Sequence, residues 1–262
     1  MDLIEKMYVE DGQSISEISR ELKISRDRVR KYLNKKDIDT NKRRNQYGFN
    51  NTVSNSLFKE IGKEEDAYWL GFLYADGNIR VDRNEISLTL QENDKDAVQS
   101  FHLFCSNKNS IRKNTIKRNG REYISYTSSF SSEEVKTNLI KRGCTPQKSF
   151  SLSFPTEEQV PKDFLYDFLR GYIDGDGYIQ YDINKSRYRI IILGTYEFLT
   201  GLIKRTGWSI GSKIYKNKKE NIFRLELSRK ELVKERLEKL YKNSTCHLLR
   251  KYKIYLNSSM GA

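Results

Sequence analysis

The chain has 262 residues, which is enough for one large domain or for a medium-sized domain and a small module. Hydrophobic residues make up 37% and charged residues 32%, which excludes wholesale disorder and allows a sizeable core. Lysine and arginine outnumber aspartate and glutamate by 48 to 35, and the net charge of +13 favours a polyanionic partner, either nucleic acid or an acidic membrane, over a merely soluble basic protein.

The few cysteines and histidines exclude several classes of site. Cys105, Cys144 and Cys246 are odd in number and far apart, so we expect neither a disulfide framework nor a zinc ribbon, as is usual in a reducing cytoplasm. With His102 and His247 as the two histidines, histidine-rich metal nuclease sites, His–Cys boxes and HExxH proteases are excluded. No apolar run approaches the ~18 residues of a membrane span, and the acidic N-terminus does not resemble a signal peptide. We therefore expect a cytoplasmic protein that has access to DNA and does not contact a membrane.

Residues 1–40 predict three short helices that form a small DNA-binding module. Ser14 and Glu17 fit a capping box at the start of the second helix, and Ser25 can cap a third helix whose outer face is basic. This order of helix, short turn and basic helix resembles the helix-turn-helix, although a three-helix unit with a solvated basic face would show the same pattern. Lys23 stands where many such turns carry glycine, so a positive φ there would cost ~1–2 kcal/mol. The predicted DNA contacts of the module are Ser25, Arg26, Arg28, Arg30 and Lys31.

Residues 41–56 are polar and basic, with little hydrophobic periodicity. We interpret them as a linker that lies along DNA phosphates through Arg43 and Arg44, and the alternative is a disordered, solvated tether. In either case the segment separates the N-terminal module from the rest of the chain.

The rest of the chain carries an internal repeat. Residues 70–77, Leu-Gly-Phe-Leu-Tyr-Ala-Asp-Gly, reappear 100 residues later at 170–177 as Arg-Gly-Tyr-Ile-Asp-Gly-Asp-Gly. The same order of predicted elements follows each copy, so we expect an α+β fold of two pseudo-symmetric αββαββα halves, residues 57–157 and 158–262. The first half predicts helices at 68–75, 94–104 and 132–142, and strands at 79–81, 86–91 and within 109–129. The second half predicts helices at 164–175, 195–205 and 229–241, and strands at 179–183, 188–193 and within 210–228.

Small residues recur four positions apart in the helix that carries each copy. Gly71 and Ala75 in the first helix, and Gly171 and Gly175 in the second, place a stripe with little side chain on one helical face. Two such stripes allow two helix backbones to approach closely. We therefore expect the two helices to pack against each other.

Asp76 and Asp176 stand at the ends of these helices, where we expect them side by side. Gly77 and Gly177, which follow them, suit the left-handed residue that ends many helices. A carboxylate is unfavourable at a helix C-terminus because it faces the negative end of the helix dipole, so a capping role explains two such aspartates poorly. The pair instead suggests a divalent metal site in which neighbouring backbone carbonyls take part.

Residues 69–77 and 169–177 look like the two copies of the LAGLIDADG motif. Either copy alone would be a weak match, but the repeat makes the match strong. Over residues 57–256 the chain resembles a single-chain, two-motif LAGLIDADG homing endonuclease. Free-standing or intron-borne members of that family often carry a helix-turn-helix, as is predicted here for the N-terminal module.

The resemblance implies roles for particular residues. It implies Mg²⁺ or Mn²⁺ as cofactor, with these ligands: Asp76, Asp176 and the carbonyl oxygens of Ala75 and Gly175. It further implies that Lys148 and Lys251 assist catalysis through ordered solvent, and the alternative for either lysine is an ordinary surface charge. Asp94 lies near the place where family members have a polar residue close to the metal, but we predict it to be the N-cap of the helix that follows.

The strand pairs have the composition of a β-ribbon that reads a DNA groove. Alternate residues of a strand share a face, so polar and basic side chains of the ribbon at 180–189 lie together. The basic ribbon tips at 112–121 and 213–219 suit phosphate contacts, and the alternative is a charged outer face of a sheet. The predicted DNA contacts of the strands are Arg80, Arg83, Gln180, Asn184, Arg187 and Arg189.

Together these features predict a monomeric, metal-dependent, site-specific endonuclease that hydrolyses both strands of double-stranded DNA at a long pseudo-palindromic site. Two alternatives stay open on the same fold, a DNA-binding regulator that does not cleave and a maturase that assists splicing of intron RNA. The regulator is disfavoured because both motif aspartates are present, whereas the sequence separates the maturase from the endonuclease poorly.

Overall fold

The computed structural model describes residues 2–11, 13, 15–38, 40, 53–148, 151–182, 187–216 and 222–260. The chain forms two compact units, Met1–Asn50 and Asn51–Ala262, and each has its own core of buried apolar side chains. Outside the described residues lie the predicted capping serine and three predicted DNA contacts, namely Ser14, Arg43, Arg44 and Asn184.

Three short helices form the N-terminal unit: α1 (Leu3–Val9), α2 (Ile15–Glu21) and α3 (Arg26–Lys35). Between α2 and α3, Lys23 has a φ of 53°, so the turn is left-handed and carries the anticipated cost of ~1–2 kcal/mol. Ser25 caps α3 as predicted, because its hydroxyl oxygen accepts a hydrogen bond of 3.3 Å from the backbone N–H of Arg28. The buried side chains of the unit are those of Met7, Tyr8, Ile18, Val29 and Leu33.

The larger unit contains two copies of the αββαββα order, which confirms the predicted α+β fold. The first copy comprises α5 (Glu64–Asp76), β1 (Gly77–Ile79), β2 (Glu85–Gln91), α6 (Lys95–Phe104), β3 (Arg112–Arg118), β4 (Arg121–Ser131) and α7 (Glu133–Lys141). The second comprises α8 (Leu165–Asp176), β5 (Gly177–Asp182), β6 (Arg187–Gly194), α9 (Tyr196–Thr206), β7 (Ser212–Lys216), β8 (Phe223–Leu227) and α10 (Lys230–Tyr241). A further helix that the sequence did not predict, α11 (Leu249–Met260), follows the second copy. Of the helices that the structure describes, none combines the length and the apolar character needed to cross a membrane.

Each copy forms one four-stranded antiparallel sheet. The strand order is β1-β2-β4-β3 in the first copy and β5-β6-β8-β7 in the second, so the two hairpins of a copy join through their inner strands. Buried Ile190 and Ile192 alternate along β6 with Arg189 and Ile191, which lie on the opposite face. Because α9 and α10 contact β6, the buried residues face these helices, and side chains on the other face of β6, those of Arg189, Ile191 and Leu193, are partly or fully exposed.

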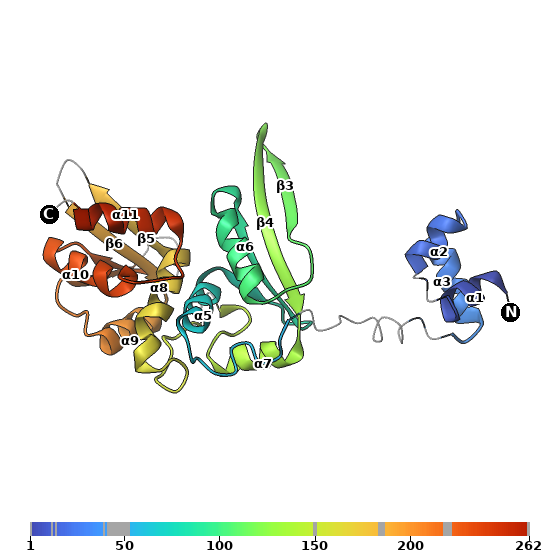
Figure 1. Ribbon diagram of the computed structural model, residues 1–262, viewed down its shortest axis with the longest axis horizontal. Helices are drawn as coiled ribbons and strands as arrows, with labels where there is room; N and C mark the ends of the chain where they lie inside the picture. Colours follow the sequence, from blue (N-terminus) through green and yellow to red (C-terminus); the bar gives the residue numbers. More distant parts are fainter. Residues whose placement is uncertain are drawn as a thin grey trace. The chain divides into compact units, whose positions relative to one another are not determined.

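The helices α5 and α8 lie side by side between the two sheets (Figure 1). Most residues of both helices are buried, which explains why α5, after its acidic first turn, is apolar on all sides rather than on one stripe. The helix pair thus forms the centre of the larger unit, and the two strands that begin directly after it, β1 and β5, carry the chain into the two sheets.

The structure corrects two predicted boundaries in the first copy. The helix α5 begins at Glu64 rather than at residue 68, because its first turn is acidic and acidic groups are favourable at the positive end of the helix dipole. The strand β1 ends at Ile79 rather than at residue 81. Arg80 and Arg83 therefore lie in the connection between β1 and β2, and not within a strand.

The predicted left-handed conformation of the two motif glycines is wrong. Gly77 has a φ of −69° and Gly177 a φ of −96°, so both are extended and begin strands. Glycine is required here for space instead. A Cβ atom would lie 2.5 Å from the carbonyl oxygen of Leu73 or of Ile173, respectively, which is far closer than such atoms approach.

Candidate metal and DNA site

The candidate site lies where α5 and α8 end. A Cβ atom on Gly71 would lie 1.9 Å from the carbonyl oxygen of Phe168, and one on Gly171 would lie 1.9 Å from that of Tyr68. The stripe of small residues therefore brings the two backbones together, as the sequence predicted. Further along the pair, a Cβ atom on Gly175 would lie 3.0 Å from a carboxylate oxygen of Asp76.

The close approach places the two motif carboxylates in one electrostatic environment. Burial and the charge of Asp176 raise the pKa of Asp76 to about 6, and burial raises the pKa of Asp176 as well. Asp76 nevertheless keeps access to solvent, and Asp176 is half-buried. The charges of Lys148 and Lys251 act in the opposite direction on both carboxylates. A cation placed between two such carboxylates would relieve their repulsion.

The two predicted lysines occupy equivalent places in the repeat. The ammonium of Lys148 donates a hydrogen bond to the carbonyl of Gly77, and that of Lys251 donates one of 2.6 Å to the carbonyl of Gly177. Lys251 also donates to the carbonyls of Ile173 at 2.5 Å and Asp174 at 2.8 Å.

Their environments differ, because Lys148 is half-buried and the Lys251 residue is only 1% exposed. Burial lowers the pKa of Lys251 to about 8. The interpretation of Lys251 as an ordinary surface charge is therefore wrong. All three of its N–H groups can be used by backbone carbonyls at the end of α8, which makes it a positioning residue.

The residues at this place fit a hard divalent cation. Among the described residues, no three histidine, cysteine, aspartate or glutamate side chains come together, so the available set is two carboxylates and backbone carbonyls. Helix-terminal carbonyls lack intrahelical donors, and those of Ala75 and Gly175 lie in the last turns of α5 and α8. Oxygen donors of these kinds are the ligands that Mg²⁺ prefers.

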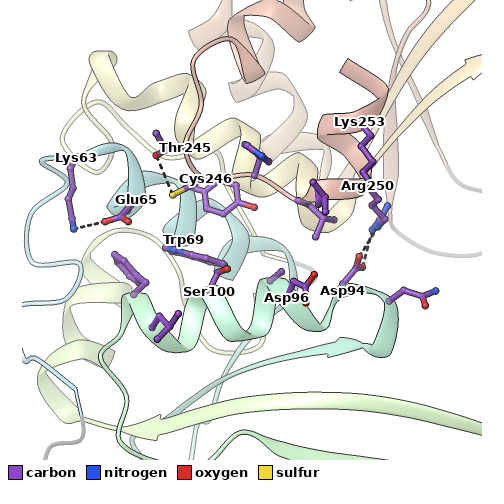
Figure 2. A pocket seen from close by; sticks show the side chains of 18 residues that line it. Lys63, Glu65, Trp69, Asp94, Asp96, Ser100, Thr245, Cys246, Arg250 and Lys253 are labelled. Atoms are coloured by element: carbon purple, nitrogen blue, oxygen red, sulfur yellow. Dashed lines mark hydrogen bonds and ion pairs between the residues drawn. The ribbon is translucent and has the colours of Figure 1, made fainter. Parts of the chain in front are cut away.

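Asp94 makes a contact that the sequence did not predict. It precedes α6, but its side chain forms no capping hydrogen bond. Its carboxylate instead accepts hydrogen bonds of 2.9 and 3.2 Å from the guanidinium of Arg250, in the second copy (Figure 2). Its charge also raises the pKa of Asp76 slightly further, so Asp94 belongs to the surroundings of the site and links the two copies.

A buried aspartate of the second motif was also missed. Asp174 is 1% exposed and accepts hydrogen bonds from the hydroxyls of Tyr68 at 3.0 Å and Tyr241 at 2.6 Å, and from the backbone N–H of Leu248 at 2.7 Å. The signal in the sequence is that the repeat has Tyr74 at the corresponding position of the first copy. A carboxylate that replaces an aromatic residue in a buried helix needs such partners.

Arg170 is the second polar residue that breaks the repeat. It is 2% exposed, and its guanidinium contacts Glu64 at 2.6 Å and Asp167 at 2.9 Å. It also donates 2.7 Å hydrogen bonds to the carbonyls of Leu240 and Cys246. This network ties the start of α5 to α8 and to the loop before α11, so it holds the two copies together.

The arginines predicted to contact DNA are mostly paired with acidic neighbours. Their ion pairs are Arg80–Asp82 at 3.0 Å, Arg83–Glu85 at 3.2 Å, Arg189–Glu226 at 3.3 Å and Arg30–Asp27 at 3.3 Å. Ion pairs at such exposed or half-exposed places are weak, so each arginine remains able to exchange its partner for a phosphate or a base. Gln180 is exposed directly opposite Arg189 in the ladder, and only the backbone of Arg187 is described. On α3, Arg26, Arg28 and Lys31 are exposed.

The hairpin of β3 and β4 is the most exposed part of the first sheet. Every residue of β3 is exposed, and Figure 1 shows the hairpin reaching past α6. Its turn has positive φ at Asn119 and Gly120, as a two-residue turn of this hand requires. The exposed strand carries the predicted basic tip, which suits contacts to a phosphate backbone.

Comparisons with known proteins identify the family of the second copy. Residues 163–241 match the family described as a LAGLIDADG-like domain. The chain contains a LAGLIDADG-like domain. No curated protein matches the chain.

Solved structures extend the likeness to about three quarters of the chain. The homing endonuclease I-WcaI, bound to its DNA recognition sequence, is similar with a TM-score of 0.55 at 13% identity, over 75% of this chain and 87% of that one. A double mutant of I-SmaMI is similar with a TM-score of 0.49 at 13% identity, over 74% of this chain and 89% of that one. Full-length WhiA from Thermatoga maritima is similar with a TM-score of 0.46 at 17% identity, over 79% of this chain and 66% of that one. The likeness to I-WcaI shows that the two sheets and the central helix pair form the LAGLIDADG fold.

Proposed function

We propose that this protein is a metal-dependent, site-specific DNA endonuclease that acts as a monomer on both strands of a duplex. The observation that carries the proposal is the pair Asp76 and Asp176. The two carboxylates end a helix pair whose contact leaves no room for a single Cβ atom at Gly71 or Gly171. Two carboxylates that lie close together repel each other, and the C-terminal end of a helix disfavours negative charge. Such an unfavourable arrangement is typical of a functional site.

The carboxylates and the carbonyls of Ala75 and Gly175 would hold Mg²⁺ or Mn²⁺ between the helix ends. A bound cation of this kind supplies Lewis-acid chemistry, which activates water and polarises a phosphodiester. Lys251 holds the last carbonyls of α8 and thereby fixes the position of Asp176. Lys148, which is less buried, adds positive charge next to the place where a scissile phosphate would lie.

The two copies would each contact one half of a long DNA site through the open face of a sheet. In this proposal, β3 and β4 contact phosphates, the arginines near β1, β2 and β6 contact bases or phosphates, and α3 of the N-terminal unit enters a major groove. One chain carries both copies of the motif, so it supplies two carboxylates without a second subunit. The imperfect repeat suits a site whose two halves differ.

The test is a cleavage assay with the full-length protein, duplex DNA of randomised sequence and Mg²⁺, followed by mapping of the ends. Asp76→Asn and Asp176→Asn keep the size of the side chain but remove the charge that a cation needs. Either change is expected to lower double-strand cleavage by orders of magnitude while metal-free binding to the target is kept. Asp163→Asn is the matched control, because Asp163 is exposed and lies just before the start of α8, far along the helix from Asp176. This variant should cleave DNA like the unchanged protein.

Two results would contradict the proposal. If both aspartate variants cut both strands at the rate of the unchanged protein, the carboxylate pair is not the catalytic site. If the unchanged protein binds a target but never cuts it with Mg²⁺ or Mn²⁺, the regulator or the maturase takes the place of the endonuclease.

A further inference from the structure

A groove lies between α5, α6, the loop before α11 and the first turns of α11. Its volume is about 900 Å³, within the ~300–1,000 Å³ that ligand sites usually have. In Figure 2, Ser100 and Asp96 of α6 and Asp94, which directly precedes α6, lie along one side of it, and Trp69 of α5 and Cys246 of the loop lie across from them.

The repeat has a second groove at the corresponding place, and there it is filled by the chain itself. Residues 152–156 belong to no helix or strand and lie against α8 and α9. Phe154 is 8% exposed, with its ring centroid 5.7 Å from that of Phe168 and 5.1 Å from that of Phe198. A Cβ atom on Gly201 would lie 2.7 Å from the Cβ of Phe154, so this glycine makes the space for the inserted side chain.

The three residues around Phe154 have counterparts that line the open groove. Phe168 corresponds to Tyr68, eight residues before the motif aspartate in each copy. The N-caps Thr195 and Asp94 align α9 with α6, so Phe198 corresponds to Ala97 and Gly201 to Ser100. The open groove is lined by all three counterparts: Tyr68, Ala97 and Ser100.

The chain takes different paths after the two equivalent lysines. After Lys148 it continues into the segment 152–156, which covers α9, whereas Lys251 lies inside α11, which contacts β5 and α10 instead. The counterpart of this segment is thus missing over α6 in the part of the chain that the structure describes. Leu103 and Leu249, which line the open groove, are left 75% and 51% exposed.

We propose that this groove binds an extended segment of a partner protein, which inserts a large apolar side chain between Tyr68, Ala97 and Ser100. The filled groove shows what such a segment looks like: Ser-Leu-Ser-Phe-Pro, with the aromatic side chain as the anchor. There, Arg205 donates hydrogen bonds to the carbonyls of Pro155 and Thr156. In the open groove, the exposed amine of Lys253 offers donors to the carbonyls of a bound segment, and so does that of Lys63, which is also paired with Glu65 at 2.7 Å.

The test measures binding of fluorescein-labelled heptapeptides to the full-length protein by fluorescence polarisation. The probe is Ser-Leu-Ser-Phe-Pro-Thr-Glu, the sequence of residues 151–157, and its partner peptide has alanine in place of phenylalanine. We expect the phenylalanine peptide to bind at least ~10-fold more tightly, because an aromatic side chain is removed from water. Ser100→Trp should abolish this difference by filling the place of the anchor. Gln99→Trp, at an exposed neighbour that does not line the groove, should keep it.

Three outcomes would overturn the proposal. They are no binding of either peptide at millimolar concentration, equal binding of both peptides, and unchanged binding to Ser100→Trp. A fourth outcome would replace the occupant. If the protein self-associates and Ser100→Trp alone makes it monomeric, the segment that enters the groove comes from a second copy of this chain, and no other partner is involved.

Discussion

Lys148 and Lys251 show what a repeat predicts about single residues and what it leaves out. Their similar distance from the motif aspartates placed them at equivalent positions, and both do donate to the carbonyl of the motif glycine. Their burial was not predictable, because it depends on what the chain does afterwards. The turn into α11 buries Lys251, whereas Lys148 stays half-exposed. The ion pair of Asp94 with Arg250 was not predictable either, because it joins residues of different copies and a repeat does not show how its copies contact each other.

The difference between the two lysines predicts different effects on stability. Lys251→Met keeps the length of the side chain but leaves three backbone carbonyls without their donor in a buried place, which should lower the free energy of unfolding by ~2–4 kcal/mol. Lys148→Met removes one hydrogen bond at a place that water reaches, so a loss below ~1 kcal/mol is expected. Urea unfolding of the two full-length variants under the same conditions measures both. Equal losses would mean that Lys251 does not hold the end of α8.

At the scale of elements, the internal repeat carried most of the prediction. The order αββαββα followed from two copies of one pattern, and the stripe of small residues correctly placed α5 against α8. The motif glycines were misread, because a glycine that ends a helix and one that avoids a clash look the same in a sequence. The helix α11 was missed because it has no counterpart in the first copy. The groove over α6 is the consequence of that asymmetry.

The helix contact can be tested at one glycine. Gly71→Ala would place a Cβ atom 1.9 Å from the carbonyl oxygen of Phe168, so the two helices must separate. Although alanine favours a helix, we expect a loss of ~3 kcal/mol in the free energy of unfolding, together with weaker cleavage because the carboxylates move apart. Gly62→Ala is the matched control, because nothing lies within 4 Å of the added atom. A Gly71→Ala protein as stable as this control would show that the helices do not touch there.

At the scale of the whole molecule, the helices and strands of each unit were predictable from the apolar residues that form its own core. The apolar positions of residues 1–40 suffice for three helices, and those of the repeat suffice for two sheets around a helix pair. The larger unit has the LAGLIDADG fold, for which the repeated motif was the decisive signal. The target in the proposed function was not predictable from the sequence. Arg80 and Arg189 are paired with acids of the same chain, and the sequence pattern does not say which of these arginines would contact DNA.

The division into two units leads to a prediction about affinity. Because residues 51–262 have their own core, a protein without residues 1–50 should fold and should cut DNA at the same position. Its affinity for DNA should be lower. The slope of the logarithm of the binding constant against the logarithm of the salt concentration should become flatter by about one unit for each lost phosphate contact. In the full-length protein, replacement of Arg28 and Lys31 on α3 by alanine should reproduce part of the change. The same substitution at Lys6, exposed on α1, should not. Unaltered affinity and salt slope in the shortened protein would mean that the N-terminal unit does not contact the target.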